Sequence, residues 1–144
     1  MKVDAILKEK GGRVVTVRPD TSIDTVIRRM KLDRIGAVVV SADGETIAGI
    51  LSERDILYGL VEHGIALLGL KAADVMTHEV LTCSREDSVQ SIMHRMTHRR
   101  VRHLPVIENG RLCGMISIGD AVKHRLGEVE LEANVLRDAY LAVR

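Results

Sequence analysis

Residues 14–44 read VVTVRPDTSIDTVIRRMKLDRIGAVVVSADG, and residues 80–110 read VLTCSREDSVQSIMHRMTHRRVRHLPVIENG. The two stretches align without a gap at an offset of 66, and the alignment continues through residues 46 and 112. At an offset of 65, a Gly-x-x-Ser-x-x-Asp pattern then appears in both copies. Two copies of one small unit must bury their apolar faces against each other, which leaves clefts between them.

Each copy predicts the element order β-α-β-β-α. Short apolar runs predict strands, and apolar residues at helical spacing predict the helices. The predicted strands are 14–17, 37–40 and 47–51 in the first copy and 80–83, 104–107 and 112–117 in the second. Serine side chains suit the first turns of the helices, at Ser22, Ser52, Ser88 and Ser117. The dipeptides Asp43-Gly44 and Asn109-Gly110 favour tight hairpin turns.

These elements divide the chain into a first repeat at 2–66, a second repeat at 70–127 and a C-terminal amphipathic helix at 128–144. A short helix over 72–76 is expected to lead into the second repeat. The C-terminal helix either packs back on its own domain or pairs with another copy or a partner. We favour a contact in a dimer.

Composition narrows the function. The chain is 46% hydrophobic without Trp or Phe, and its net charge of +1 exerts no overall attraction on nucleic acid or acidic lipid. It contains no run of about 20 apolar residues that could span a membrane.

Cys83 and Cys113 lack metal or disulfide spacing, which favours reduced thiols in the cytoplasm. His94 and His98 could hold a metal, but no third ligand completes a set, so a solvated basic face is favoured. No nucleophile and base pattern points to an enzyme.

The repeat, its hairpin glycines, the Gly-x-x-Ser-x-x-Asp pattern and Arg102-His103-Leu104-Pro105-Val106 resemble a tandem pair of CBS domains, named after cystathionine β-synthase. The resemblance covers roughly residues 2–127 and is that of a stand-alone pair. It implies an α/β (α+β) fold with pseudo-twofold packing through the sheets. It also implies clefts that bind AMP, ADP, ATP, NAD(H) or S-adenosylmethionine, a homodimer, and no cofactor.

Ser-x-x-Asp at a helix start is also a capping box, so the motif has a purely structural interpretation. The resemblance instead implies that Asp55 and Asp120 hold the ribose, with Ser52 and Ser117 near the ribose or phosphate. Carboxylates accept hydrogen bonds from ribose hydroxyls in this way in dinucleotide folds.

Basic residues are the predicted phosphate contacts. Arg102 and His103 take this role by resemblance, since the guanidinium makes paired bonds to phosphate. The first copy has Gly36-Ala37 there, with Arg34 and Arg54 as its nearest cations, so the two clefts should differ. The predicted nucleotide-binding residues are Thr16, Ala37, Val38, Ser52, Arg54, Asp55, Thr82, Arg102, His103, Leu104, Pro105, Ser117 and Asp120. Among them, the resemblance implies that the two threonines lie beside the nucleotide, and Val38 and Leu104 are expected to flank the adenine.

The sequence therefore predicts a non-enzymatic sensor of adenine nucleotides that passes energy status to an unidentified partner protein. One alternative is a nucleic-acid-binding protein that uses the basic cluster at 95–103, with strongly salt-dependent affinity. Another is an interaction module with empty clefts.

Overall fold

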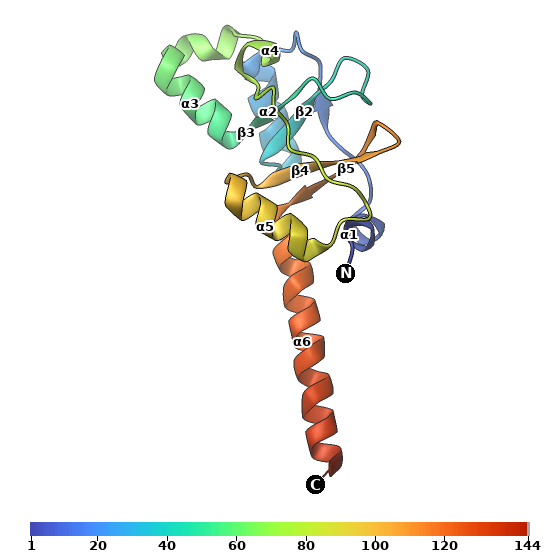
Figure 1. Ribbon diagram of the computed structural model, residues 1–144. Helices are drawn as coiled ribbons and strands as arrows, with labels where there is room; N and C mark the ends of the chain where they lie inside the picture. The colour runs from blue at the N-terminus through green and yellow to red at the C-terminus, as the bar shows by residue number, and fades with distance from the viewer. Residues whose placement is uncertain (144) are drawn as a thin grey trace.

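The computed structural model describes residues 1–143, with one small β-sheet in each copy of the repeat (Figure 1). The strands are β1 (Thr16–Val17), β2 (Ala37–Val40) and β3 (Gly49–Ser52) in the first copy, and β4 (His103–Glu108) and β5 (Arg111–Ser117) in the second. The helices are α1 (Val3–Lys10), α2 (Ile23–Asp33), α3 (Glu53–His63), the 3-10 helix η1 (Gly64–Gly69), α4 (Ala72–Val75), α5 (Val89–Arg99) and α6 (Ile118–Val143). The predicted fold class is confirmed.

The first copy forms a three-stranded sheet in the order β1-β2-β3. β1 runs parallel to β2, with Thr16 opposite Val39, and β2 runs antiparallel to β3. Ser22 begins α2 as predicted, because its hydroxyl accepts a hydrogen bond from the backbone N–H of Thr25. All of β2 is buried, which explains its uninterrupted apolar sequence.

The second copy pairs only β4 with β5, and the strand predicted at 80–83 is reduced to a single bridge at Cys83. Pro105 is the physical cause. At the corresponding position of the first copy, the Val39 N–H donates a hydrogen bond of 3.2 Å to the Val15 carbonyl across the parallel ladder. Proline has no N–H, so the second copy lacks this bond. The prediction of a full strand was wrong.

The two predicted turns also differ. Asn109 and Gly110, with φ of 51° and 76°, join β4 directly to β5 in the predicted tight hairpin. The prediction of a tight hairpin at Asp43-Gly44 was wrong, because a loop over residues 41–48 separates β2 from β3. The carboxylate of Asp43 instead accepts hydrogen bonds of 2.7 and 2.8 Å from two backbone N–H groups of this loop. These bonds hold the pKa of the carboxyl well below its usual value.

The segments that lead into the two copies are exchanged between the two hydrophobic cores. α1 precedes the first copy in the chain, yet Ile6 and Leu7 are buried in the core of the second copy. In turn, Leu67 of η1 and Ala72 of α4 are buried in the core of the first copy. The short helix predicted at 72–76 therefore exists, but it packs on the first copy.

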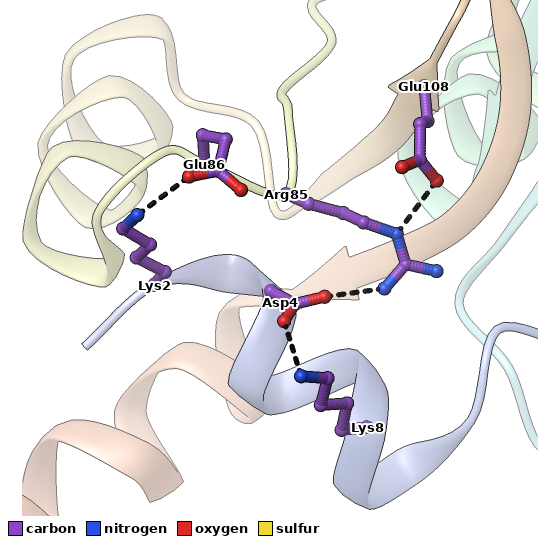
Figure 2. A network of polar contacts seen from close by, with 6 residues as sticks. All are labelled: Lys2, Asp4, Lys8, Arg85, Glu86 and Glu108. Carbon is purple, nitrogen blue, oxygen red and sulfur yellow. Dashed lines mark hydrogen bonds and ion pairs between the residues drawn. The ribbon is translucent and has the colours of Figure 1, made fainter.

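Ion pairs fasten α1 to the second copy (Figure 2). Arg85 donates from Nη1 to Asp4 Oδ1 at 2.8 Å and from Nε to Glu108 Oε2 at 3.1 Å. At the start of the helix, Lys2 Nζ lies 2.6 Å from Glu86 Oε2. At the other end of α1, Lys10 Nζ donates to the Met115 carbonyl of β5 at 2.9 Å and lies 2.7 Å from Asp120 Oδ2 of α6, so this end contributes to a cleft described below.

α6 is one continuous helix, so the C-terminal helix does not begin at residue 128 as predicted. Gly127 lies inside the helix and does not have the positive φ of a glycine that ends one. Every residue from 129 to 143 is exposed, and the helix extends away from both copies (Figure 1), so it does not pack back on its domain. Residue 144 lies outside the described residues. None of the helices in 1–143 is long and apolar enough to cross a membrane.

Candidate functional site: two clefts between the copies

Two clefts lie between the copies, and several of the predicted binding residues line them. The larger, cleft 1, has a volume of about 810 Å³. The first copy lines it with Gly36, Ile50 and the start of α3, and the second copy lines it with residues 79–81 and 99–103. Cleft 1 therefore brings together five predicted residues, namely Ser52, Arg54, Asp55, Arg102 and His103.

The smaller cleft, cleft 2, has a volume of about 350 Å³ and repeats the plan of cleft 1. Seven residues of cleft 2 have counterparts 66 positions later that line cleft 1: residues 13–15 match 79–81, and residues 34–37 match 100–103. At an offset of 65, Ser117 of cleft 2 matches Ser52 of cleft 1. The two clefts are thus related by the pseudo-twofold symmetry of the repeat.

Ser52 and Asp55 form a capping box at the start of α3. Asp55 Oδ2 accepts a hydrogen bond from the Ser52 N–H at 2.8 Å, and its Oδ1 accepts one from the Thr77 hydroxyl at 2.9 Å. A carboxylate oxygen has two lone pairs, so Oδ1 can accept a further hydrogen bond from a ligand in cleft 1. The structural and the ligand-binding interpretations of this motif are therefore compatible.

Asp120 has the same backbone bond but a different second partner. Its Oδ2 accepts from the Ser117 N–H at 2.9 Å and lies 2.7 Å from Lys10 Nζ. Burial opposes ionisation of the Asp120 carboxyl, but the Lys10 ammonium and the Ser117 N–H outweigh it, so its pKa is lowered. Lys10 lines cleft 2 and Asp120 does not, so at this point cleft 2 presents an ammonium group.

Arginines are the most numerous charged residues of cleft 1, with four of them against the carboxylates of Glu53, Asp55 and Glu79. Arg99, Arg100 and Arg102 of the second copy and Arg54 of the first line it. Arg54 Nη1 donates to the Arg100 carbonyl at 2.9 Å and so links the copies. Arg100 ends α5 in the left-handed conformation with φ of 54°, as Arg34 does at the end of α2. This conformation costs a non-glycine residue about 1 kcal/mol, and in both copies it is an arginine lining a cleft that adopts it.

His103 and Gly36 lie where the clefts meet, because each of them lines both. A Cβ at Gly36 would lie 2.5 Å from Glu53 Oε1 and 3.1 Å from His103 Cε1, so any side chain there would require the Glu53 carboxylate to move. Burial lowers the pKa of His103 below its usual 6.5, an effect that the Glu53 carboxylate opposes only in part. The imidazole is therefore mainly neutral at pH 7 and can donate one hydrogen bond and accept another.

Three predicted strand residues lie away from both clefts. Val38 and Leu104 are fully buried in the first and second cores, and Pro105 is also buried. Side chains alternate between the two faces of a strand. Ala37 and His103, one residue earlier on β2 and β4, accordingly line the clefts. This placement differs from the prediction that Val38 and Leu104 flank an adenine ring.

The two predicted threonines also stay off the cleft walls. Thr16 and Thr82 are half-buried and line neither cleft, whereas Val15 and Leu81, the residues just before them, line cleft 2 and cleft 1. The alternation of an extended chain again explains the difference, since adjacent side chains point in opposite directions.

Sequence reasoning did not identify Lys10, Thr77 and Arg100 as residues of the clefts. Lys10 lies outside the aligned repeat, and the exchange of α1 between the cores carries it to the second copy. One signal was available for Arg100, which is identical to Arg34 at the matching position of the other copy. Identity between copies at a left-handed position is unexpected from backbone preference alone.

The basic cluster at 95–103 does not form one surface. Arg95 donates to the Thr82 carbonyl and pairs with Asp87 Oδ2 at 3.3 Å, while the later arginines line cleft 1. The cluster is thus divided between an intramolecular ion pair and a cleft of ligand size. Within residues 1–143, no three His, Cys, Asp or Glu side chains come together as a metal site.

Comparison with known proteins identifies the family. The CBS domain family matches residues 10–62 and 72–127. The CBS domain-containing protein CBSX3, mitochondrial, of Arabidopsis thaliana is 34% identical over 129 residues, which cover 84% of this chain and 63% of that protein. This chain therefore spans less than two thirds of that relative. The CBS-domain containing protein ATU1752 from Agrobacterium tumefaciens has a crystal structure with a TM-score of 0.83 and 44% identity, covering 86% of this chain and 92% of its own.

A more distant structure shares the fold. The CBS domain pair of protein MJ0100, crystallised in complex with 5′-methylthioadenosine and S-adenosyl-L-methionine, has a TM-score of 0.77 at 19% identity, covering 89% of this chain and 98% of its own. The family match spans both copies of the repeat, and the clefts follow the symmetry of those copies. This chain belongs to the CBS domain family, as a tandem pair of CBS domains.

Proposed function

We propose that this chain is a regulatory module without catalytic activity that binds an adenine nucleotide in cleft 1. The observation that carries the proposal is the lining of cleft 1, because the Asp55 carboxylate of one copy and three arginines of the other line the same cavity of about 810 Å³. A volume of this order suits a ligand of nucleotide size. The binding of adenosine compounds by MJ0100 supports the class of ligand.

The chemistry of cleft 1 matches the parts of a nucleotide. The aliphatic side chains of Ile50, Leu81 and Val101 offer apolar walls to a base, and the free lone pair of Asp55 Oδ1 accepts from a ribose hydroxyl. The arginines suit phosphate, because a guanidinium makes paired, charge-assisted hydrogen bonds to it. AMP, ADP, ATP, NAD(H) and S-adenosylmethionine all contain the adenosine part, and the arginines favour those that carry phosphate.

Cleft 2 is expected to bind more weakly or to take a smaller ligand. It has less than half the volume of cleft 1, and its charged lining is entirely basic, with Lys10, Arg13 and Arg34. The acid that would accept from a ribose is paired with Lys10. A small anionic group fits this lining better than a second complete nucleotide does.

Regulation follows from the position of cleft 1 between the copies. A ligand that touches both copies stabilises the relative arrangement of the copies in which both sets of contacts form. A partner protein that binds this arrangement more tightly than others would then respond to the ligand. In this proposal the chain reports energy status in the cytoplasm as a homodimer and needs no cofactor.

The test is isothermal titration calorimetry with adenosine, AMP, ADP, ATP, NAD, NADH and S-adenosylmethionine, with GTP and CTP as controls. We expect saturable binding of adenosine compounds, and a loss of roughly tenfold to a hundredfold in affinity for Asp55→Asn, the effect of losing a hydrogen bond to a charged group. Asp24→Asn, which changes a carboxylate on the surface of α2, is the matched control. No heat from any nucleotide at millimolar concentration would overturn the proposal, and salt-dependent binding of DNA or RNA would replace it.

A further inference from the structure

The exposed part of α6 carries a regular apolar stripe. Apolar residues recur at alternating intervals of four and three, at Val122, Leu126, Val129, Ala133, Leu136, Tyr140 and Val143. This heptad stripe is exposed along its whole length, and it covers just over three heptads. A repeat of 3.5 residues is the pattern by which two helices wind around each other in a coiled coil.

The helix also lacks support from its own domain. Residues 129–143 are all exposed, and α6 extends away from the second copy on the side opposite the first (Figure 1). An isolated helix of this length is marginal in water, because most helical stability in proteins comes from packing an apolar face. A partner for the heptad stripe would supply that packing.

The charges beside the stripe identify the partner as a second molecule of this chain, in parallel orientation. In the heptad stripe, Leu126, Ala133 and Tyr140 are the a positions. In a parallel coiled coil, the residue just before each a position faces the residue five places after it on the other chain. These facing pairs are Arg125 with Glu130 and Glu132 with Arg137, and both are attractive. Each pair occurs twice in a symmetric dimer. Most positions that flank the stripe are charged, namely Lys123, Arg125, Glu130, Glu132 and Arg137, as is typical of a two-stranded seam.

We propose that α6 forms a parallel two-stranded coiled coil with α6 of a second copy of this chain, through the heptad stripe. The second repeats of the two chains then lie side by side at the base of the coiled coil, and both chains run in the same direction. This inference does not depend on any nucleotide.

The first test is disulfide trapping in the full chain. In a parallel, in-register pair, residue 129 lies beside residue 129 of the other chain, and residue 136 beside residue 136. Val129→Cys and Leu136→Cys should therefore both give a covalent dimer under mild oxidation. Leu131→Cys is the control, because this side chain is 66% exposed, close to the 71% of Leu136, but lies off the heptad stripe.

Trapping at neither stripe position beyond the level of Leu131→Cys would overturn the coiled coil. Trapping at only one of them would overturn the parallel orientation, since an antiparallel pair can place at most one residue beside its own counterpart. Each trapped species should have twice the chain mass of 15.9 kDa by light scattering, and a mass of four chains would overturn the two-stranded form.

The second test reverses charge. Arg137→Glu places the new carboxylate opposite Glu132 of the other chain. The dissociation constant of the dimer should rise roughly tenfold, since two exposed ion pairs become repulsive. Glu132→Arg added to Arg137→Glu restores opposite charges and should restore the dimer. These two residues are five apart on one helix and do not face each other within a chain. Failure of the double variant to recover would contradict the assigned facing pairs.

Discussion

Lys10 Nζ lies 2.7 Å from Asp120 Oδ2, so the end of the first helix in the chain meets the acid at the start of the last one. The corresponding acid of the first copy, Asp55, accepts from the neutral hydroxyl of Thr77 instead. The two clefts share one plan but differ in charge at this position. The difference arises because α1 is packed in the core of the second copy.

Replacing Lys10 by Met is expected to lower the free energy of unfolding by roughly 0.5–1 kcal/mol at pH 7, the range of a partly exposed ion pair. The folded state lowers the pKa of Asp120 below its usual 3.8, so the pair stabilises the protein above that pH and loses its effect as the pH falls. The difference between wild type and Lys10→Met should therefore shrink below about pH 4. Urea denaturation at several pH values measures it.

Lys31→Met is the control for this variant, since Lys31 is an exposed lysine at the end of α2 that makes no ion pair among the described residues. It should change stability by less than about 0.5 kcal/mol. A pH-independent difference for Lys10→Met would mean that the side chain acts through its hydrogen bond to the Met115 carbonyl or by packing, and not through Asp120.

Arg102→Gln is expected to lower the affinity for ATP by about tenfold or more while leaving the affinity for adenosine unchanged. Arg102 is exposed on the wall of cleft 1, where its guanidinium would bond a phosphate and not a base or ribose. Titration calorimetry with the two ligands separates these cases. Arg28→Gln, on the exposed side of α2, should alter neither affinity. An equal loss for ATP and adenosine would place Arg102 elsewhere in the site.

His103 is expected to make the fold less stable as the pH falls from 7 toward 5.5. Burial keeps its pKa below 6.5 in the folded state, whereas in the unfolded chain it takes up a proton as the pH drops through 6.5. The unfolded state then binds more protons, so the free energy of unfolding decreases. His103→Gln should remove this part of the pH dependence.

His98→Gln, at an exposed residue of α5, is the matched control for the substitution of a histidine by glutamine. The charged groups that influence His103 are Glu53, Lys10, Asp120 and Arg102. Profiles that coincide for wild type and His103→Gln between pH 5.5 and 7 would show that His103 is protonated equally in both states.

Cys113 is expected to react with iodoacetamide much faster than Cys83 in the folded protein. Cys83 is buried in the core, and burial raises its pKa to about 12, so little of the reactive thiolate forms. Cys113 is only half-buried. Mass spectrometry of the labelled peptides measures both rates, and in urea the two thiols should react alike. Equal rates in the folded protein would mean that the second core opens readily.

The local features of this fold were predictable because their causes are local. A serine hydroxyl that accepts the N–H three residues later sets the start of α2, and apolar spacing sets the buried face of the helix. The clefts were predictable as a consequence of the repeat. The left-handed conformation of Arg34 and Arg100 could not be predicted, since such a position usually indicates glycine or asparagine.

Features that depend on packing between distant segments could not be predicted from the sequence. Pro105 removes a ladder bond that its counterpart Val39 makes, a consequence readable only once the strand register is known. The loop at 41–48 replaces a hairpin because β3 begins later than the turn signal at Gly44 indicated. Above all, nothing in the sequence of α1 states that it packs on the second copy.

Ile6→Ala tests that packing directly. Ile6 is 1% exposed in the core of the second copy, so its truncation leaves a cavity and should cost about 2–5 kcal/mol in the free energy of unfolding. Because α1, η1 and α4 are exchanged between the cores, we expect both copies to lose stability in one cooperative transition. Urea denaturation followed by circular dichroism measures the midpoint and the number of transitions. Ile65→Ala, at a residue 85% exposed in η1, should cost less than about 0.5 kcal/mol. If the two variants unfolded at the same urea concentration, α1 would not be part of the second core in solution, and Lys10 could not be held beside Asp120.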